Sequence, residues 1–464
     1  MERRRGAVNA AADGMRDVWR QLAPAVLRAL AALALALSAA QAPAQTILRD
    51  AELERAMREL ARPVIAASGL SPSGIRVLLI EDARPNAFVV DARSIFLTSG
   101  LVLRMDRPAM LQAVIAHEVA HIANGHLTRR ASNMRTARSA AIMGLALAAA
   151  VAAADDTGAA GIGIAAGTSS AALRRFLAHT RAEEAAADRS GLRYMARAGV
   201  DPQGMVEVLE IFEGQEAIAP GRQDPYLRTH PLSRERLRAV RGLAAAFDAT
   251  GPADADAAYW FARSRAKLSA YLRNPGWTLR RLDAADSSDA ALVARAVANS
   301  QAARGAAALQ AADALVAKRP DDPYAHELRG WVLFEARDYD AAARAYARAV
   351  ALAPGEPLIA AGHGRALLAT GTQDAAARDV LERARARDPF NPSLLRDLAL
   401  AQARTGQPGA ASLSTAERYA LSGRLRDAKI HATRAAGLLP RGSAGWQRAE
   451  DIIAAAETQE RRNR

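Results

Sequence analysis

The chain has 464 residues, enough for two or three domains, and it is 50% hydrophobic but only 5% aromatic, a mixture that favours packed helices. The formal net charge is +13, but only three of the 62 basic residues are lysines, and acidic residues interleave with the basic ones. No basic face carries interleaved stacking aromatics, so we expect no nucleic-acid partner. Cysteine is absent, which excludes disulfides and cysteine-ligated metals, and any metal must be bound by His, Asp or Glu.

Residues 1–44 have the pattern of a secretory signal peptide. A leader with six arginines precedes the apolar run Ala29–Ala40, and Ala42-Pro43-Ala44 provides a cleavage site. The apolar run is too short to span a bilayer permanently, although an uncleaved anchor remains the alternative. An exported chain without cysteine indicates a bacterial periplasm.

Between residues 50 and 130 the pattern predicts two helices around three short strands. Asp50–Ala67 has helical periodicity and an acidic start. Strands are expected at Ile75–Ile80, Ala87–Val90 and Ser94–Thr98. One long helix then covers Pro108–Arg130, with Asp106 as its N-cap and its proline in the first turn, where the missing N–H is harmless.

Residues 139–173 carry almost no charge and are rich in alanine and glycine. The run Ala140–Ala154 is marginal for crossing a membrane, so we predict a hydrophobic helix-loop excursion that packs on the domain or touches lipid. A true membrane span, and with it a membrane-integral peptidase, is the alternative. A second long helix is expected over Phe176–Ala198 and is ended by Gly199.

The motif HEVAH, from His117 to His121, lies in the middle of the first long helix. Histidines four residues apart share one helix face and can direct their imidazole nitrogens at one metal ion. Glu118 lies about 100° round the helix from His117, where it can take a proton from the attacking water and give it to the leaving amine. The neighbouring residues are apolar, and burial of these polar groups without a metal would be costly. We therefore predict one zinc ion per chain, with Glu118 as catalytic base.

A catalytic zinc needs a third protein ligand and an open fourth position. Glu184 and Asp188 are four residues apart on the second long helix. Glu184 would complete a His-His-Glu set of the thermolysin type, and Asp188 could accept the free N–H of a ligand histidine. Glu183 is the competing ligand, but no acid follows it one turn later. His126 comes one residue too early for a third histidine ligand on the same helix, and we expect it to bond locally near the helix end.

Beyond residue 247 the chain becomes a series of Ala-, Arg- and Leu-rich helices broken at regular intervals. Pro320, Pro354 and Pro389 are 34 and 35 residues apart. This pattern resembles the tetratricopeptide repeat, whose usual residues are matched by Gly330, Ala342, Tyr346, Ala349 and Pro354. Stacked helix pairs of this kind form a curved surface that can hold extended or unfolded segments. A plain helical bundle is the alternative.

Three further stretches accompany HEVAH and EAAADRSG: NAF at Asn86–Phe88, ARAGVDP at Ala196–Pro202 and THPL at Thr229–Leu232. Together they resemble the HtpX and CAAX-prenyl-protease family of zinc peptidases, and within it the exported, repeat-tailed, BepA-like branch. The resemblance implies that His117, His121 and Glu184 bind zinc and that Glu118 is the base. Ala186 departs from the family, which often has another Glu there; the departure leaves the ligand untouched but weakens any claim of additional negative charge beside the site.

The sequence thus predicts a mainly α fold: a gluzincin-type α+β metalloprotease domain with a small sheet, followed by an α-helical tetratricopeptide-repeat solenoid. We expect a signal peptide over 1–44, the metalloprotease domain over 45–246, a helical linker over 247–284 and the repeat domain over 285–464. The resemblance implies a periplasmic peptidase that cleaves misassembled outer-membrane proteins and assists their assembly. Its partners would be those proteins and their assembly machinery, with peripheral membrane contact. The rival from another class is a repeat-based chaperone or scaffold with a latent peptidase core.

Two further segments, Asn86–Phe88 and the loop with His230, each have more than one possible role. Asn86, Ala87 and Phe88 are a candidate edge strand to which a substrate peptide adds, or they form a simple sheet edge. His230, on a proline-stiffened loop, is a candidate for the open zinc position or for the developing oxyanion. A structural histidine that caps a turn is an equal alternative for His230.

Overall fold

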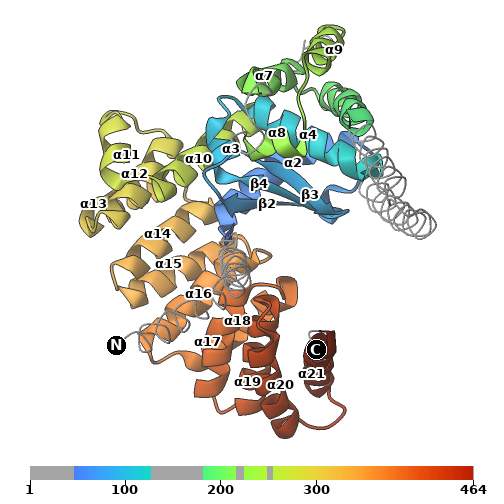
Figure 1. The fold of residues 1–464 in the computed structure, drawn as a ribbon. Coiled ribbons are helices and arrows are strands. Elements are labelled where there is room, and N and C mark those ends of the chain that lie inside the picture. The colour runs from blue at the N-terminus through green and yellow to red at the C-terminus, as the bar shows by residue number, and fades with distance from the viewer. Residues whose placement is uncertain (1–45, 127–180, 216–223, 248–253, 463–464) are drawn as a thin grey trace, which may run out of the picture. The chain divides into compact units, whose positions relative to one another are not determined.

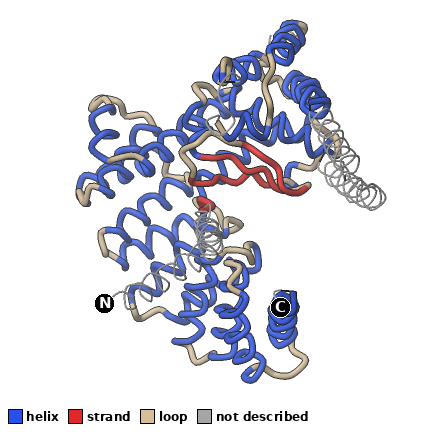
Figure 2. The backbone as a smooth tube through the Cα atoms, in the orientation of Figure 1, coloured by secondary structure: helices blue, strands red, loops and turns tan. Residues whose placement is uncertain are grey.

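The computed structural model describes residues 46–126, 181–215, 224–247 and 254–462. The described part is mainly helical with one small sheet (Figures 1 and 2). The predicted signal peptide, the excursion over 139–173 and the start of the second long helix lie outside the described residues.

The sheet has four strands in the order β1-β2-β4-β3: β1 (Thr46–Leu48), β2 (Arg76–Glu81), β3 (Ala87–Asp91) and β4 (Ser94–Thr98). β2 and β4 are parallel, and β3 runs antiparallel to β4 and forms one edge. Four consecutive residues of β2 are buried, which means that both faces of this strand are covered. The three predicted strands are confirmed, two of them with bounds shifted by one residue.

Helices surround the sheet in the first half of the chain. The first helix begins at Ala51, one residue later than predicted, and Asp50 caps it by accepting a hydrogen bond from the backbone N–H of Leu53. Residues 181–197 are helical and carry the EAAAD segment. That first helix is α2 (Ala51–Ala67). The remaining helices of this half are α3 (Ser99–Arg104), α4 (Pro108–Ala123), α7 (Gln203–Ile211), α8 (Pro225–Thr229) and α9 (Arg234–Ala245).

The first long helix differs from its prediction at both ends. Arg107, not Asp106, occupies the N-cap position, and it makes no capping hydrogen bond through its side chain. α4 ends at Ala123 rather than Arg130, because Gly125 adopts a left-handed conformation (φ 66°) that interrupts the helix. Every residue from Ala109 to His121 is buried, so α4 is the central helix of this part of the fold.

The second half is a series of paired helices, as the repeat spacing predicts. Several of them begin with a proline at the first helical position, where the missing N–H costs nothing. The helices are α10 (Ala255–Leu272), α11 (Pro275–Arg281), α12 (Asp289–Gln301), α13 (Gly305–Lys318), α14 (Pro323–Glu335), α15 (Tyr339–Leu352), α16 (Pro357–Thr370), α17 (Asp374–Arg387), α18 (Pro392–Arg404), α19 (Pro408–Leu421), α20 (Leu425–Leu438) and α21 (Ala444–Arg462). α10 belongs to two cores: Phe261 packs with the sheet-containing half and Ala270 with the first paired helices.

Candidate metal centre

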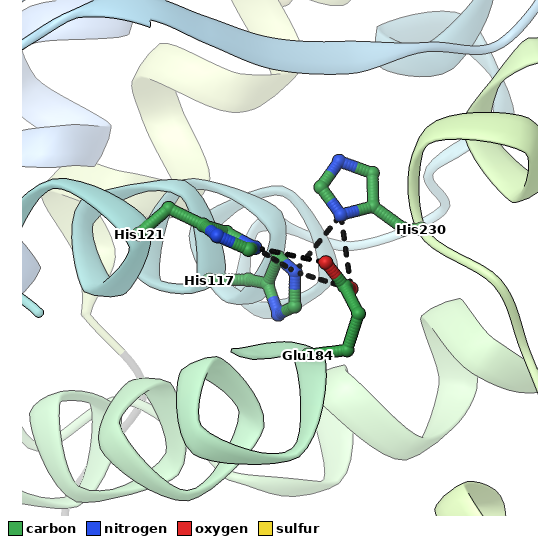
Figure 3. Close-up of side chains that lie close together, drawn as sticks. All are labelled: His117, His121, Glu184 and His230. Atoms are coloured by element: carbon green, nitrogen blue, oxygen red, sulfur yellow. Dashed lines mark hydrogen bonds and ion pairs between the residues drawn. The ribbon is translucent and has the colours of Figure 1, made fainter. Parts of the chain in front are cut away.

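Four side chains from three segments point toward one another beside the sheet (Figure 3). His117 and His121 come from α4, Glu184 from the helix at 181–197 and His230 from the residue after α8. All four are buried, and one ligand atom of each lies within 4.8 Å of the others. His230, whose role the sequence left open, thus joins the three predicted ligands in one cluster.

The distances within the cluster fit a shared metal ion. The Nε2 atoms of His117 and His121 are 3.0 Å apart, and each lies 3.2 Å from a carboxylate oxygen of Glu184. Nδ1 of His230 lies 3.0 Å from Glu184 and 3.2 Å from His117. Donor atoms around a tetrahedral zinc ion are separated by about 3.3 Å, given zinc–ligand distances of about 2.0–2.1 Å. Three imidazoles and one carboxylate are also a donor set that zinc accepts.

The predicted base Glu118 is completely buried next to this cluster. Its Oε1 lies 3.2 Å from Nε2 of His230, and neither carboxylate oxygen accepts a hydrogen bond from the described residues. Charge on the neighbouring histidines outweighs the effect of burial and lowers the pKa of Glu118. An ionised carboxylate with spare acceptor capacity is suited to receive a proton from water.

Asp188 lies where the sequence predicts a partner for a ligand histidine. Its Oδ1 is 3.0 Å from Nδ1 of His117, so it can fix the tautomer that leaves Nε2 for a metal. Burial alone would raise the pKa of Asp188, but the guanidinium of Arg236 outweighs it and lowers the pKa to about 2. The competing acid Glu183 is buried but is absent from the four-residue cluster.

Sequence reasoning did not single out Arg236, although it braces the whole site. Its Nε and Nη2 donate to the two oxygens of Asp188 at 2.6 and 2.9 Å, and its Nη1 donates to the carbonyls of His230 and Pro231. Arg236 is nine per cent exposed, and the buried Leu237 and Val240 follow it on α9. The sequence pattern that could have indicated a buried arginine is its position beside the apolar stripe of an amphipathic helix. This pattern is weakly specific, because most arginines beside such stripes are exposed.

His126 lies deeper in the site than its position near the end of α4 suggests. It is buried, and its Nδ1 lies 2.9 Å from Nδ1 of His121. The prediction of a local contact is confirmed, and that contact is with a candidate metal ligand. The break at Gly125 places His126 one turn from His121 without continuing the helix.

The electrostatics of the cluster favour a bound cation. Hydrogen bonds and charges from the histidines outweigh burial and hold the pKa of Glu184 well below its usual value. Burial lowers the pKa of His121, which favours the neutral imidazole that binds metals. Glu184 and Glu118 outweigh burial at His230 and raise its pKa to about 10. The buried carboxylates therefore attract positive charge, which a divalent cation supplies as well as a proton does.

Asn86, Ala87 and Phe88 lie at the start of the edge strand β3, next to the cluster. The carbonyl of Ala87 lies 3.2 Å from Nε2 of His230, and the side chain of Asn86 accepts a hydrogen bond from Thr229. The candidate edge strand and the candidate metal ligands are therefore in direct contact.

Comparison with known proteins finds relatives of the first half of the chain. Residues 48–244 match the model of Peptidase family M48. The putative beta-barrel assembly-enhancing protease of Vibrio cholerae is 29% identical over 251 residues, which are 49% of this chain and 51% of that protein. The beta-barrel assembly-enhancing protease of Escherichia coli is 27% identical over 198 residues, 43% of this chain and 40% of that protein. The mitochondrial metalloendopeptidase OMA1 of Schizosaccharomyces pombe is 28% identical over 184 residues, 38% of this chain and 49% of that protein.

These matches span about half of the length of each relative, or less. The family match includes α4, the described part of the helix that carries Glu184, and the segment that carries His230. It ends close to the last residue of α9, before the paired helices begin. The similarity to Peptidase family M48 therefore covers the segments that carry all four residues of the cluster.

Proposed function

We propose that this chain is a zinc-dependent endopeptidase of the periplasm that cleaves misfolded or misassembled outer-membrane proteins. The observation that supports this most directly is the buried cluster of His117, His121, Glu184 and His230 beside the ionised, buried Glu118. The catalytic domain would be residues 45–246, and the repeat domain over 285–464 would handle substrate. The names of the relatives, which refer to β-barrel assembly, support the choice of substrate class.

In this mechanism His117, His121 and Glu184 hold one zinc ion per chain. The zinc would polarise the scissile carbonyl and make the attacking water more acidic. Glu118 accepts the proton of that water and passes it to the leaving amine. Asp188 keeps Nε2 of His117 directed into the cluster, and Arg236 holds Asp188 in place.

Substrate binding at the edge of the sheet is part of the same proposal. β3 pairs only with β4 among the described strands, so its outer edge can pair with an extended peptide. The segment Asn86–Phe88 lies beside His230, which would bring such a peptide close to the cluster. Backbone pairing of this kind gives affinity without a strong sequence preference, as the handling of many unfolded substrates requires.

A groove on the repeat half suits unfolded polypeptide, and we propose that it contributes to substrate handling and to chaperone-like assistance. Its volume is about 560 Å³, and its walls include residues of α17, α19 and α21. Phe390 and Leu421, which are 65% and 41% exposed, line it together with Arg385, Glu417 and Arg448. Exposed apolar side chains of this size are binding candidates, because water solvates them poorly.

Glu118→Gln tests the catalytic proposal. The amide keeps the shape of the side chain but cannot accept the proton, so we expect casein cleavage and self-cleavage to fall by at least about 100-fold. The zinc content, measured by elemental analysis, should stay at one ion per chain. Unchanged cleavage would refute the mechanism. Loss of both zinc and cleavage would mean that Glu118 contributes to metal binding instead.

The second candidate function is a chaperone with a latent peptidase core, and the position of His230 favours it. With His230 as fourth ligand, the coordination position needed by the carbonyl and the water would be closed. His230→Ala should then increase casein cleavage, whereas it should decrease cleavage if His230 stabilises the oxyanion. Equal cleavage by wild type and His230→Ala would exclude both roles.

The remaining alternative is a membrane-integral peptidase; among the described helices, none is both long and apolar enough to cross a bilayer. The segment over 139–173, on which that alternative rests, lies outside the described residues.

A further inference from the structure

A short stretch between α10 and α12 combines arginines with aromatic residues and contains no acid. Residues 271–281 read YLRNPGWTLRR, with three arginines, Tyr271 and Trp277. We call Arg273, Trp277, Arg280 and Arg281 the arginine–tryptophan patch. Composition and net charge do not reveal this stretch, because it is only eleven residues long and basic residues are dispersed over the rest of the chain.

The structure brings Arg273 and Arg281 together at Trp277, and Arg280 lies exposed on the same short helix. The guanidinium carbons of Arg273 and Arg281 lie over the indole ring of Trp277, at 4.3 and 4.5 Å from its centroid. All three arginines are exposed, and Tyr271 beside them is 52% exposed. None of the three forms an ion pair with any carboxylate in the part of the chain that the structure describes.

The backbone under the patch is well fixed. The side chain of Asn274 caps α11 by accepting a hydrogen bond from the N–H of Trp277, and Pro275 occupies the first turn. Thr278 is buried, and the carbonyl of Tyr271 accepts a hydrogen bond from Gln301 of α12. Arg280 and Arg281 lie in the last turn of α11 and Arg273 directly precedes its N-cap residue; Figure 1 labels α11 beside α10 and α12.

Other basic groups nearby already have partners. Lys318 and Arg319 both bind the buried Asp289, and Arg295 donates to the backbone carbonyls of Asp283 and Ala284. The three arginines of the patch therefore differ from these neighbours in making no ion pair among the described residues, although the exposed Asp283 and Asp286 follow closely in the chain. An anionic ligand complements the patch.

We propose that the arginine–tryptophan patch binds the anionic phospholipid surface of a membrane. Guanidinium groups bind phosphate oxygens in pairs, and tryptophan and tyrosine rings prefer the headgroup region, where one end is apolar and the other wet. Nucleic acid fits less well, because the guanidiniums over Trp277 occupy the ring surface on which a base would stack. This surface differs from the segment over 139–173 and does not depend on the proposed peptidase activity.

The test is co-sedimentation of the full chain with vesicles. One set contains equal parts of phosphatidylglycerol and phosphatidylcholine, and the other contains phosphatidylcholine only. We compare the ratio of anionic to neutral binding for wild type and for the triple variant Arg273→Gln, Arg280→Gln, Arg281→Gln. At low salt we expect the variant to lower this ratio on the order of 100-fold, and high salt should lower the wild-type ratio in the same way.

The matched control removes three exposed arginines of the repeat half that have no ion pair among the described residues: Arg344→Gln, Arg434→Gln, Arg441→Gln. It has the same net charge as the patch variant and should bind anionic vesicles as wild type does. An equal ratio for wild type and patch variant, or an equal loss in both variants, would overturn the proposal. So would tighter binding of a single-stranded oligonucleotide than of the anionic vesicles, if the patch variant abolishes it.

Discussion

Arg236 illustrates how one residue can position several parts of a site, and its Nη1 also lies 3.2 Å from a carboxylate oxygen of Glu184. Its two hydrogen bonds to Asp188 are charge-assisted and buried, and Asp188 in turn contacts His117. The same guanidinium donates to the carbonyls of His230 and Pro231, so it also fixes the loop that carries the fourth cluster residue. Two separate segments of the cluster are therefore positioned by a single planar group.

Arg236→Lys keeps the charge but loses this geometry, because one ammonium group cannot reproduce the paired donors. We expect zinc affinity to fall by about 10- to 100-fold, as is typical when the partner of a metal ligand is removed. Competition with a chromophoric chelator measures the affinity, and casein cleavage gives the accompanying loss in kcat/KM. The control is Arg241→Lys, whose exposed pair with Glu210 should matter little. Unchanged zinc affinity in Arg236→Lys would contradict the bracing role.

At the level of elements, the site depends on how closely helices approach α4. α7 contacts the first turn of α4 through Gly204, where an added Cβ would lie 2.5 Å from the carbonyl oxygen of Ala109. The neighbouring helix at 181–197 approaches α4 through Gly191, whose added Cβ would lie 2.9 Å from the side chain of Met205 and 3.4 Å from the backbone at Ala116 and His117. Small residues at these crossings allow the helices that carry Glu184 and the two histidines to pack together.

Gly204→Ala should destabilise the domain by about 1–3 kcal/mol, because the new methyl group meets backbone atoms that cannot move independently. Thermal unfolding followed by circular dichroism measures the effect. Gly242→Ala in α9 is the control: no atom lies within 4 Å of its added Cβ, so better helix propensity should stabilise it by roughly 0.5–1 kcal/mol. Equal melting temperatures for the two variants would argue against close packing at this crossing.

At the level of the whole molecule, a buried charged cluster joins α2, α10 and α14. Arg263 contacts Glu52 and Asp322, and it is only 1% exposed. Nζ of Lys267 lies 2.8 Å from Asp50, 3.1 Å from Glu52 and 3.5 Å from Glu327. Two cations thus face four carboxylates. Protonation of one carboxylate therefore reduces the repulsion among the negative charges. Burial, together with repulsion from Asp50 and Glu52, outweighs Lys267 and raises the pKa of Glu327 to about 7.

This raised pKa gives the stability a defined pH dependence. Between about pH 4.5 and 7 the folded chain binds more protons at Glu327 than the unfolded chain does, so this contribution to stability falls as pH rises through that range. Glu327→Gln removes the contribution. We expect it to melt close to wild type at pH 4.5 and above wild type at pH 8.

The matched control is Glu335→Gln, an exposed position on the same helix, which should follow the wild-type pH profile. Lower stability of Glu327→Gln than wild type at pH 8 would show that the ionised Glu327 is a net stabilising partner of Lys267.

Local patterns explain which predictions are confirmed. The three strands, the first helix with its acidic start and the paired helices follow from side-chain alternation, helical periodicity and proline spacing, all of which act over a few residues. The N-cap at Asp106 is wrong: Arg107 takes that position, and the exposed Asp106 side chain lies 3.4 Å from Arg265 of α10. α4 ends earlier than predicted because Gly125 adopts a left-handed conformation. The prediction placed Gly125 inside the helix, because the helical pattern of apolar residues continues on both sides of it.

The sequence alone determined the helix that presents His117, Glu118 and His121, the acidic pair four residues apart, and the repeat array, because each depends on spacing along one element. Only the tertiary structure decided that His230 joins the ligands, that Arg236 braces them, and that His126 contacts His121. It also decided that the arginines beside Trp277 are left without acidic partners among the described residues. These outcomes depend on where packed helices cross and which charges burial brings together, and such distances are properties of the whole fold.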